Sequence, residues 1–189
     1  VYVNVPAGPL DIRTWLASLK QGRTFATNGP LLRFTLGGRE LGDQLRLLAG
    51  DNKVKFTASL RSIVPIDHLQ VICNGQVARD LKLNADRVSA DIEDAIPISH
   101  SGWCLLRAWS EKPEYPVLDL YPYATTSPVY VSVAGSALKP AEDASYFLAW
   151  IDRMIDAVKS NQDWNTEAEK NAVLRLLSYA RSVYQRMEK

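Results

Sequence analysis

The chain has 189 residues, of which 47% are hydrophobic and 23% are charged, and its formal net charge at pH 7 is +1. This composition is typical of a globular protein that buries a core of its own, and its balanced charge gives no reason to expect nucleic acid as a partner. No apolar run approaches the ~20 residues of a membrane-spanning helix, so we expect no membrane partner either.

The N-terminal segment predicts a short helix followed by a turn. Asp11 is suited to be the N-cap and Gly22 to end the helix. Between them, apolar residues recur at helical spacing, at Ile12, Trp15, Leu16 and Leu19. The stretch GRTFATNGP (22–30) then predicts a short strand from Thr24 to Ala26 and a turn at its end.

From residue 31 to about residue 133 the sequence alternates between strand and turn patterns. The predicted strands are 31–36, 53–60, 68–73, 76–83, 87–94, 102–109 and 128–133. Asn74-Gly75 lies between two of them and predicts a hairpin with a type I′ turn. So many short strands without helical periodicity predict a mainly β protein with some α, built on an immunoglobulin-like β-sandwich.

The C-terminal segment changes to a helical pattern. Residues 140–160 and the segment from Thr166 onward each place apolar side chains on one face. The segment NQDWNT separates these two helical patterns, and Thr166 with Glu169 fits a capping box at the start of the second one. We therefore predict an antiparallel helical hairpin over residues 139–189.

The cysteines and histidines indicate neither a metal site nor a catalytic set. Cys73 and Cys104 each lie in an apolar run, which favours two buried thiols. A disulfide is the alternative if their strands face each other in an oxidising compartment. His68 and His100 have no second ligand at metal spacing, so we expect no metal and no cofactor in this chain.

Two groups of residues are candidates for binding a ligand. Arg23, Thr24 and Asn28 lie in the glycine-containing stretch 22–30, which could hold a ligand or an anion, although a structural role as helix stop, strand and turn is favoured.

The second group is aromatic and includes Trp103, Trp109, Tyr121 and Tyr123, whose rings could stack on sugars. The favoured interpretation is that they close the end of the sandwich or contact a neighbouring domain. Arg107 lies inside an apolar strand and is expected to need a buried partner such as Asp119.

Several motifs, in order, resemble the C-terminal part of PHP-type metallohydrolases related to the carbaryl hydrolase group. They are W-L-x-x-L-x-x-GRTFATNGPLL, a Gly-Asp, CNGQV, SGW-x-x-x-R, TSPVYV and DASYFLAWID, and the resemblance covers the chain from about Trp15 to Ile151. At Thr125 that family often carries a histidine, which makes Thr125 a further candidate residue near a ligand.

The resemblance implies a domain organisation. Residues 1–30 would be the tail of a PHP-like domain, 31–138 an accessory sandwich and 139–189 the helical hairpin. The divalent metal and the catalytic residues would belong to that preceding domain of the same polypeptide, which would also be the partner of this region. The expected function is therefore that of a non-catalytic accessory domain.

Two alternative functions remain open at this point. One is a carbohydrate- or ligand-binding sandwich, and the other is an oligomerisation domain that acts through the helical hairpin. The sequence leaves open a homo-oligomer and the compartment, which would be the periplasm, the exterior or the cytoplasm of a bacterium.

Overall fold

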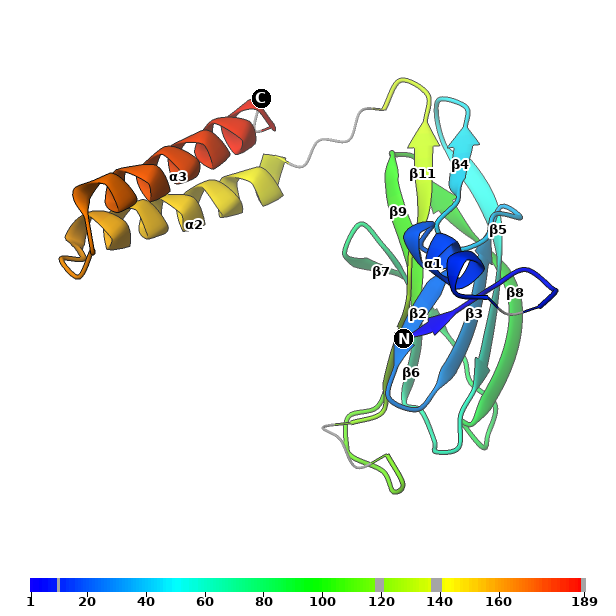
Figure 1. The fold of residues 1–189 in the computed structure, drawn as a ribbon. Coiled ribbons are helices and arrows are strands. Elements are labelled where there is room, and N and C mark those ends of the chain that lie inside the picture. Colours follow the sequence, from blue (N-terminus) through cyan, green and yellow to red (C-terminus); the bar gives the residue numbers. More distant parts are fainter. Residues whose placement is uncertain (10, 118–120, 137–140, 188–189) are drawn as a thin grey trace. The chain divides into compact units, whose positions relative to one another are not determined.

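The computed structural model describes residues 1–9, 11–117, 121–136 and 141–187, with the side chains of residues 141 and 142 left out. The chain forms two compact units, Val1–Ala137 and Leu138–Lys189 (Figure 1). The first unit contains all the described strands, and the second contains two long helices. The prediction of a mainly β protein with a C-terminal pair of helices is confirmed.

The larger sheet of the first unit is organised around one central strand, β9 (Gly102–Trp109). One edge of β9 pairs with β6 (His68–Cys73), and β7 (Gln76–Leu81) lies beyond β6. The Asn74-Gly75 hairpin is confirmed, because Cys73 pairs with Gln76 and both turn residues have positive φ, as a type I′ turn requires.

The other edge of β9 pairs with two short strands in succession. These are β10 (Tyr123–Thr126) and β11 (Val129–Val133). Beyond β10 lie β2 (Thr24–Thr27) and β1 (Tyr2–Val3), and beyond β11 lies β4 (Gln44–Leu47). The β4–β11 pair is parallel, whereas the other pairs of this sheet are antiparallel.

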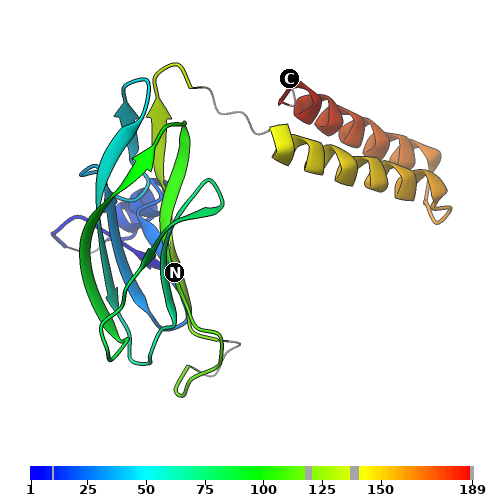
Figure 2. The same ribbon diagram turned by 180° about the vertical axis from the view of Figure 1, so that it is seen from behind.

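The second sheet contains β3 (Leu31–Leu36), β5 (Asn52–Arg61) and β8 (Ser89–Ile98), all antiparallel. Alternate residues of β3 and β5 are buried, as two-residue periodicity requires. Side chains from both sheets form one core, and Figure 2 shows the sheets face to face. Its fully buried members include Phe34, Leu60 and Ile96 from the smaller sheet and Leu69, Leu106 and Ala124 from the larger one.

Three strands were absent from the prediction. β1, β4 and β10 have two to four residues each. Such segments are too short for an alternation of apolar and polar residues to stand out. Their strand conformation depends on backbone pairing with neighbours that are distant in sequence.

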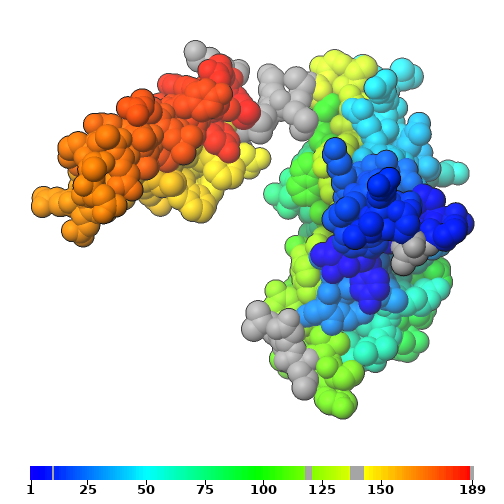
Figure 3. Space-filling view, viewed as in Figure 1, coloured from blue at the N-terminus to red at the C-terminus, as the bar shows by residue number. Residues whose placement is uncertain are grey.

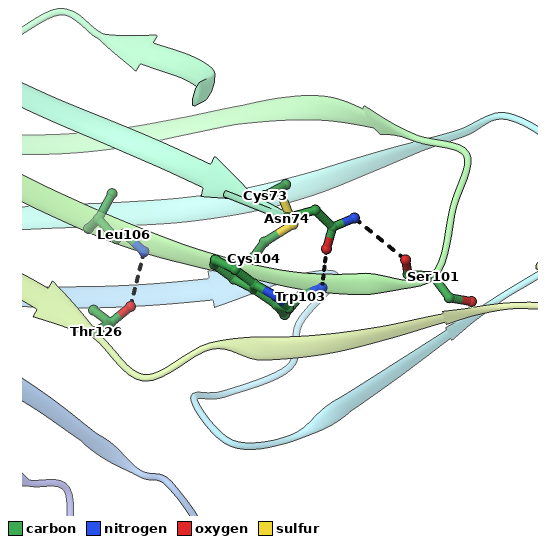
Figure 4. Close-up of a disulfide and its surroundings, with 7 residues drawn as sticks. All are labelled: Cys73, Asn74, Ser101, Trp103, Cys104, Leu106 and Thr126. Atoms are coloured by element: carbon green, nitrogen blue, oxygen red, sulfur yellow. Dashed lines mark hydrogen bonds between the residues drawn. A yellow bond between two sulfur atoms is a disulfide. The ribbon is translucent and has the colours of Figure 1, made fainter. Parts of the chain in front are cut away.

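The junction of β10 and β11 is a β-bulge against β9. Thr125 lies opposite Arg107 and Val129 lies opposite Cys104, so the β10–β11 side has one residue more than β9. Leu106 N–H donates to the hydroxyl oxygen of the buried Thr126, at 3.0 Å (Figure 4). A side-chain oxygen therefore takes the place of a backbone acceptor where the ladder is interrupted.

Cys73 and Cys104 form a disulfide between β6 and β9, so the favoured expectation of two free thiols is wrong. The two residues are direct cross-strand partners with Cα atoms 4.1 Å apart (Figure 4). The register of β6 on β9 brings them together, which periodicity alone does not specify. Beside them, Trp103 N–H donates to the Asn74 side-chain oxygen at 2.9 Å.

Helix α1 (Ile12–Lys20) begins where it was predicted to begin. The Asp11 carboxylate accepts from the Thr14 hydroxyl and from the backbone N–H groups of Arg13 and Thr14, and these hydrogen bonds hold the pKa of Asp11 below its ordinary value. The helix buries Ser18, and its apolar residues Ile12, Leu16 and Leu19 are exposed. Figure 3 shows the N-terminal residues, in blue, on the surface of the first unit.

The second unit is a hairpin of α2 (Ala141–Ser160) and α3 (Glu167–Met187). Glu169 N–H donates to the Thr166 hydroxyl at 3.1 Å, which is one half of the predicted capping box. Ala144, Leu148 and Ile151 of α2 are buried, as is Leu177 of α3. Within the described residues, neither these nor the shorter helix is long and apolar enough to cross a membrane.

We expect Thr126→Val to destabilise the first unit by about 1–3 kcal/mol, because the buried Leu106 N–H loses its acceptor. Urea unfolding followed by near-ultraviolet circular dichroism measures the change. Thr125→Val is the control, because among the described residues the Thr125 hydroxyl makes only one long hydrogen bond, 3.5 Å to Thr126 O. Equal losses in both variants would contradict the role given to Thr126.

The hairpin should lose stability in acid. The hydrogen bonds from Arg181 lower the pKa of Asp152 below its ordinary value of 3.8. A carboxylate with a lowered pKa in the folded state stabilises at neutral pH, and this contribution disappears as pH falls through that lowered pKa. The helical signal of the native chain should therefore melt at lower temperature below about pH 3.8. Asp152→Asn should show a smaller shift, and an unchanged shift would contradict the assignment.

Candidate functional site: a polar hollow beside the strand bulge

A shallow hollow of about 560 Å³ lies in the first unit beside the β10–β11 bulge. We call it the Ser127 hollow. It is lined by three separate segments of the chain, which are Lys20, Gln21, Gly22 and Arg23, then Gly42 and Asp43, and finally Ser127, Pro128 and Tyr130. Two of the predicted ligand-binding residues, Arg23 and Thr24, therefore lie at or directly beside it.

Strand pairing brings these segments together. β2 begins at Thr24 and β4 begins at Gln44, and both beginnings meet the bulge. Ser127 N–H donates to Thr24 O at 2.8 Å, and Tyr130 N–H donates to Asp43 O at 2.9 Å. Gly42 N–H donates to Pro128 O at 2.9 Å. Backbone hydrogen bonds thus hold the wall of the hollow.

Two glycines allow the first two segments to touch. Gly22 and Gly42 have φ values of +75° and +82°, which disfavour residues with a Cβ. A Cβ on Gly22 would lie 3.4 Å from the Gly42 Cα, and a Cβ on Gly42 would overlap the carbonyl oxygen of Gln21. The close approach of the end of α1 to the start of β4 therefore needs glycine at position 42.

The side chains of the hollow are polar and incompletely paired. Thr24 Oγ1 and Ser127 Oγ are 2.7 Å apart and share a hydrogen bond. Arg23 Nη2 lies 4.0 Å from Asp43 Oδ1, at the outer limit of an ion pair. Arg23 Nε is buried, and among the described residues it has no hydrogen-bond acceptor. The guanidinium therefore keeps donor capacity for a further acceptor.

The hollow is suited to hydrogen bonding and charge recognition. Its lining supplies two cations, Lys20 and Arg23, one carboxylate, Asp43, and the hydroxyl groups of Ser127 and Tyr130. The lining contains neither histidine nor cysteine. In the described part of the chain, no three His, Cys, Asp or Glu side chains gather into a potential metal-binding group.

The structure places Asn28, Tyr121 and Tyr123 together, away from the Ser127 hollow. Tyr123 N–H donates to Asn28 Oδ1 at 2.7 Å, and Asn28 Nδ2 donates to Tyr121 O at 2.7 Å. Both ends of the Asn28 amide are thus engaged by the backbone. The two tyrosine rings meet edge to face, with centroids 6.2 Å apart.

Arg107 and Thr125 are cross-strand partners on β9 and β10. Arg107 Nη2 donates to Gln70 Oε1 at 2.7 Å, and Trp109 Nε1 donates to the same oxygen at 3.3 Å. Asp119, which was expected to pair with Arg107, lies outside the described residues. The partner in the structure is Gln70, which is only 7% exposed and which the sequence analysis missed.

Trp103 lies six positions from Trp109 along β9, opposite Tyr130 of β11. At the rise of an extended strand this separation is about 20 Å. Trp103 is therefore not brought together with Tyr121 and Tyr123, which lie at the Trp109 end of the strand.

Sequence reasoning named Arg23 and Thr24 but missed Asp43, Ser127 and Tyr130 as their neighbours. The signal was present in the ordered motifs, because Gly42-Asp43 and TSPVYV (126–131) are two of them. What was lacking was the pairing of β4 with β11, which places the two motifs side by side.

We expect Gly42→Ala to destabilise the first unit by at least about 2 kcal/mol more than Gly50→Ala. Both positions have positive φ, and an alanine there carries backbone strain of about 1–2 kcal/mol. Only at Gly42 would the Cβ also meet backbone atoms, whereas nothing lies within 4 Å of a Cβ at Gly50. Urea unfolding measures both losses, and equal losses would show that the segments do not touch.

No protein-family model, curated protein or solved structure matches the chain. The interpretation of the Ser127 hollow therefore rests on its own residues and on the ordered motifs that form it.

Proposed function

We propose that this chain is a non-catalytic accessory region of a PHP-like metal-dependent hydrolase, and that it packs against the catalytic domain through α1 and the Ser127 hollow. The single observation that carries this proposal is the orientation of α1. Three of its apolar residues, Ile12, Leu16 and Leu19, are exposed next to a polar hollow built from the motifs of the family resemblance.

Helix α1 turns Trp15 partly toward the first unit but leaves a second set of apolar residues, Ile12, Leu16 and Leu19, exposed. Ile12 is 74% exposed and Leu16 is 50% exposed, whereas Ser18 is only 3% exposed. Surface helices normally turn the apolar stripe toward a core. A clustered apolar stripe that remains exposed is typical of a surface that another domain or protein covers.

The Ser127 hollow continues this surface. Lys20 is the last residue of α1, and Lys20, Gln21, Gly22 and Arg23 all line the hollow. An apolar stripe beside a group of hydrogen-bonding side chains is the composition of a domain interface with a polar rim. In this arrangement Arg23 and Asp43 would bind polar groups of the covering domain.

Catalysis and the divalent metal belong, in this proposal, to the preceding domain of the same polypeptide. The residues that line the hollow do not form a metal-ligand set, so no reaction step is assigned to them. Thr125, where the family often carries a histidine, lies opposite Arg107 on the larger sheet.

We also propose that the first unit is a variant of the immunoglobulin-like sandwich. Two mainly antiparallel sheets that share one core support this. One difference from antibody domains is the disulfide, which joins neighbouring strands of one sheet here and the two sheets there. The alternative of a carbohydrate-binding sandwich has less support, because Trp103 lies apart from Tyr121 and Tyr123.

The test is to express this chain together with the sequence that precedes it in its gene, and to measure metal-dependent hydrolysis of simple aryl esters and phosphoesters. We expect Ile12→Glu with Leu16→Glu to reduce hydrolysis at least about 10-fold, because two carboxylates would be buried at the interface. Ile63→Glu is the matched control, since Ile63 is 72% exposed and lies in a loop.

Two results would overturn the proposal. One is a preceding sequence that encodes no His/Asp/Glu ligand set, or a longer protein without metal-dependent hydrolysis. The other is a longer protein whose activity and unfolding are unaffected by the two α1 substitutions. The first result removes the hydrolase, and the second removes α1 as its docking surface.

A further inference from the structure

The Arg23 guanidinium lies at the Ser127 hollow without an acceptor of its own. Arg107, which is half-buried like Arg23, donates to Gln70 at 2.7 Å. The Arg23 side chain makes no hydrogen bond within the described part of the chain, and its Nη2 is 4.0 Å from Asp43 Oδ1, which exceeds a hydrogen-bond distance. A half-buried cation whose N–H donors are all free is suited to bind an acceptor that comes from outside this chain.

Asp43 does not act as that acceptor, because the backbone holds it at a distance. Glu40 N–H donates to Asp43 Oδ2 at 3.2 Å, and Tyr130 N–H donates to the backbone oxygen of Asp43 at 2.9 Å. These two bonds fix the carboxylate at the turn that precedes β4. The donors of Arg23 therefore remain available although a carboxylate is nearby.

The terminal nitrogens of Arg23 can be reached by a ligand in the hollow. The side chain is 37% exposed, and Nε is the buried nitrogen, whereas Nη1 and Nη2 keep contact with solvent. Lys20 lines the same hollow and brings a second positive charge. A ligand that reaches Nη1 and Nη2 therefore lies close to two cations.

The charges around the hollow favour a ligand with a single negative charge. Lys20 and Arg23 are opposed by Asp43 alone among the lining residues. A second hollow, which Arg23 also lines, adds one cation, Arg33, and one carboxylate, Glu40, so the excess of one positive charge is unchanged. A doubly charged phosphate would add more negative charge beside Asp43 than the two cations can offset. A carboxylate carries one charge, and its planar shape matches the guanidinium fork.

We infer that the Ser127 hollow binds a carboxylate, with Nη1 and Nη2 of Arg23 donating to its two oxygens and Lys20 supplying the second positive charge. This inference rests on the proposed function only for the source of the carboxylate. In the longer protein that source is an Asp or Glu side chain of the covering domain. The binding chemistry itself belongs to the residues of this chain.

The test is a titration of the full chain with sodium acetate, followed by the nuclear magnetic resonance signal of Arg23 Nε–H. Sodium chloride at equal ionic strength is the reference, because it screens charges without supplying a carboxylate. We expect a saturable shift with a dissociation constant on the order of 10 mM, as for one charge-assisted pair at a partly exposed site. Phosphate at pH 7.5 should bind at least about 3-fold more weakly than acetate.

Three variants assign the binding to these side chains. Arg23→Gln should abolish the saturable shift, which is then followed at the backbone N–H signals of Gly42 and Ser127. Lys20→Gln should weaken acetate binding at least about 3-fold, because one of the two cations is lost. Arg46→Gln is the charge-matched control and should bind acetate like the native chain, since Arg46 is exposed on β4 and does not line the hollow.

Backbone signals away from the hollow show whether each variant remains folded. A shift of Arg23 Nε–H that depends on ionic strength alone would overturn the inference. Tighter binding of phosphate than of acetate would overturn the choice of a carboxylate. An equal loss of binding in Arg46→Gln and Arg23→Gln would show that total charge, and not the hollow, attracts the anion.

The same signal in the longer protein identifies the source of the carboxylate. If the covering domain supplies it, Arg23 Nε–H is already displaced and no longer responds to acetate. A response equal to that of this chain alone would overturn this source and leave the hollow as a site for a small free carboxylate. The acetate titration of this chain requires neither hydrolysis nor docking, so a failure of the proposed function would leave its result unchanged.

Discussion

The fold of the first unit depends on the β-bulge at which the strand paired with one edge of β9 changes from β10 to β11. Pro128 has no N–H group, so the strand that begins at Tyr123 cannot continue as a regular ladder through this position. The extra residue is accommodated because the Thr126 hydroxyl accepts from Leu106 N–H inside the core. The interruption also divides this part of the chain into two strands, β10 and β11. On its other edge, β10 pairs with β2, and β11 pairs with β4. The Ser127 hollow lies where these neighbours begin.

The same interruption explains why the hollow is polar within a sheet whose core is apolar. At a regular ladder, backbone groups would be paired and side chains would pack closely. Here Thr24 and Ser127 bond through their hydroxyls, and Arg23 remains loosely paired with Asp43. Gly42 lets the end of α1 touch the start of β4, which fixes the position of α1 beside the hollow. The exposed apolar residues of α1 and the polar hollow therefore lie next to each other because the backbone at Gly42 allows this close contact.

The apolar residues left exposed in both units have one physical cause, which is that a small element cannot bury all its apolar residues by itself. α1 has nine residues and contacts the first unit through the side that contains Ser18. α2 and α3 bury a few apolar residues, among them Leu148 and Leu177, but leave others exposed, among them Trp150, Leu176 and Tyr179. In the first unit, the proposed covering domain would approach from the side on which Ile12, Leu16 and Leu19 are exposed.

The sequence by itself determined the elements whose cause is local. Asp11 capped α1, Asn74-Gly75 formed the hairpin turn, and alternation or helical spacing marked the longer strands and both C-terminal helices. Only the tertiary structure decided the features that depend on pairing between distant segments. These are the short strands β4 and β10, the disulfide between Cys73 and Cys104, the Gln70 partner of Arg107, and the meeting of Arg23 with Asp43. The physical reason is register. Hydrogen bonding between strands and burial of one face determine which residues lie opposite each other in a sheet. The spacing of residues along one strand specifies neither.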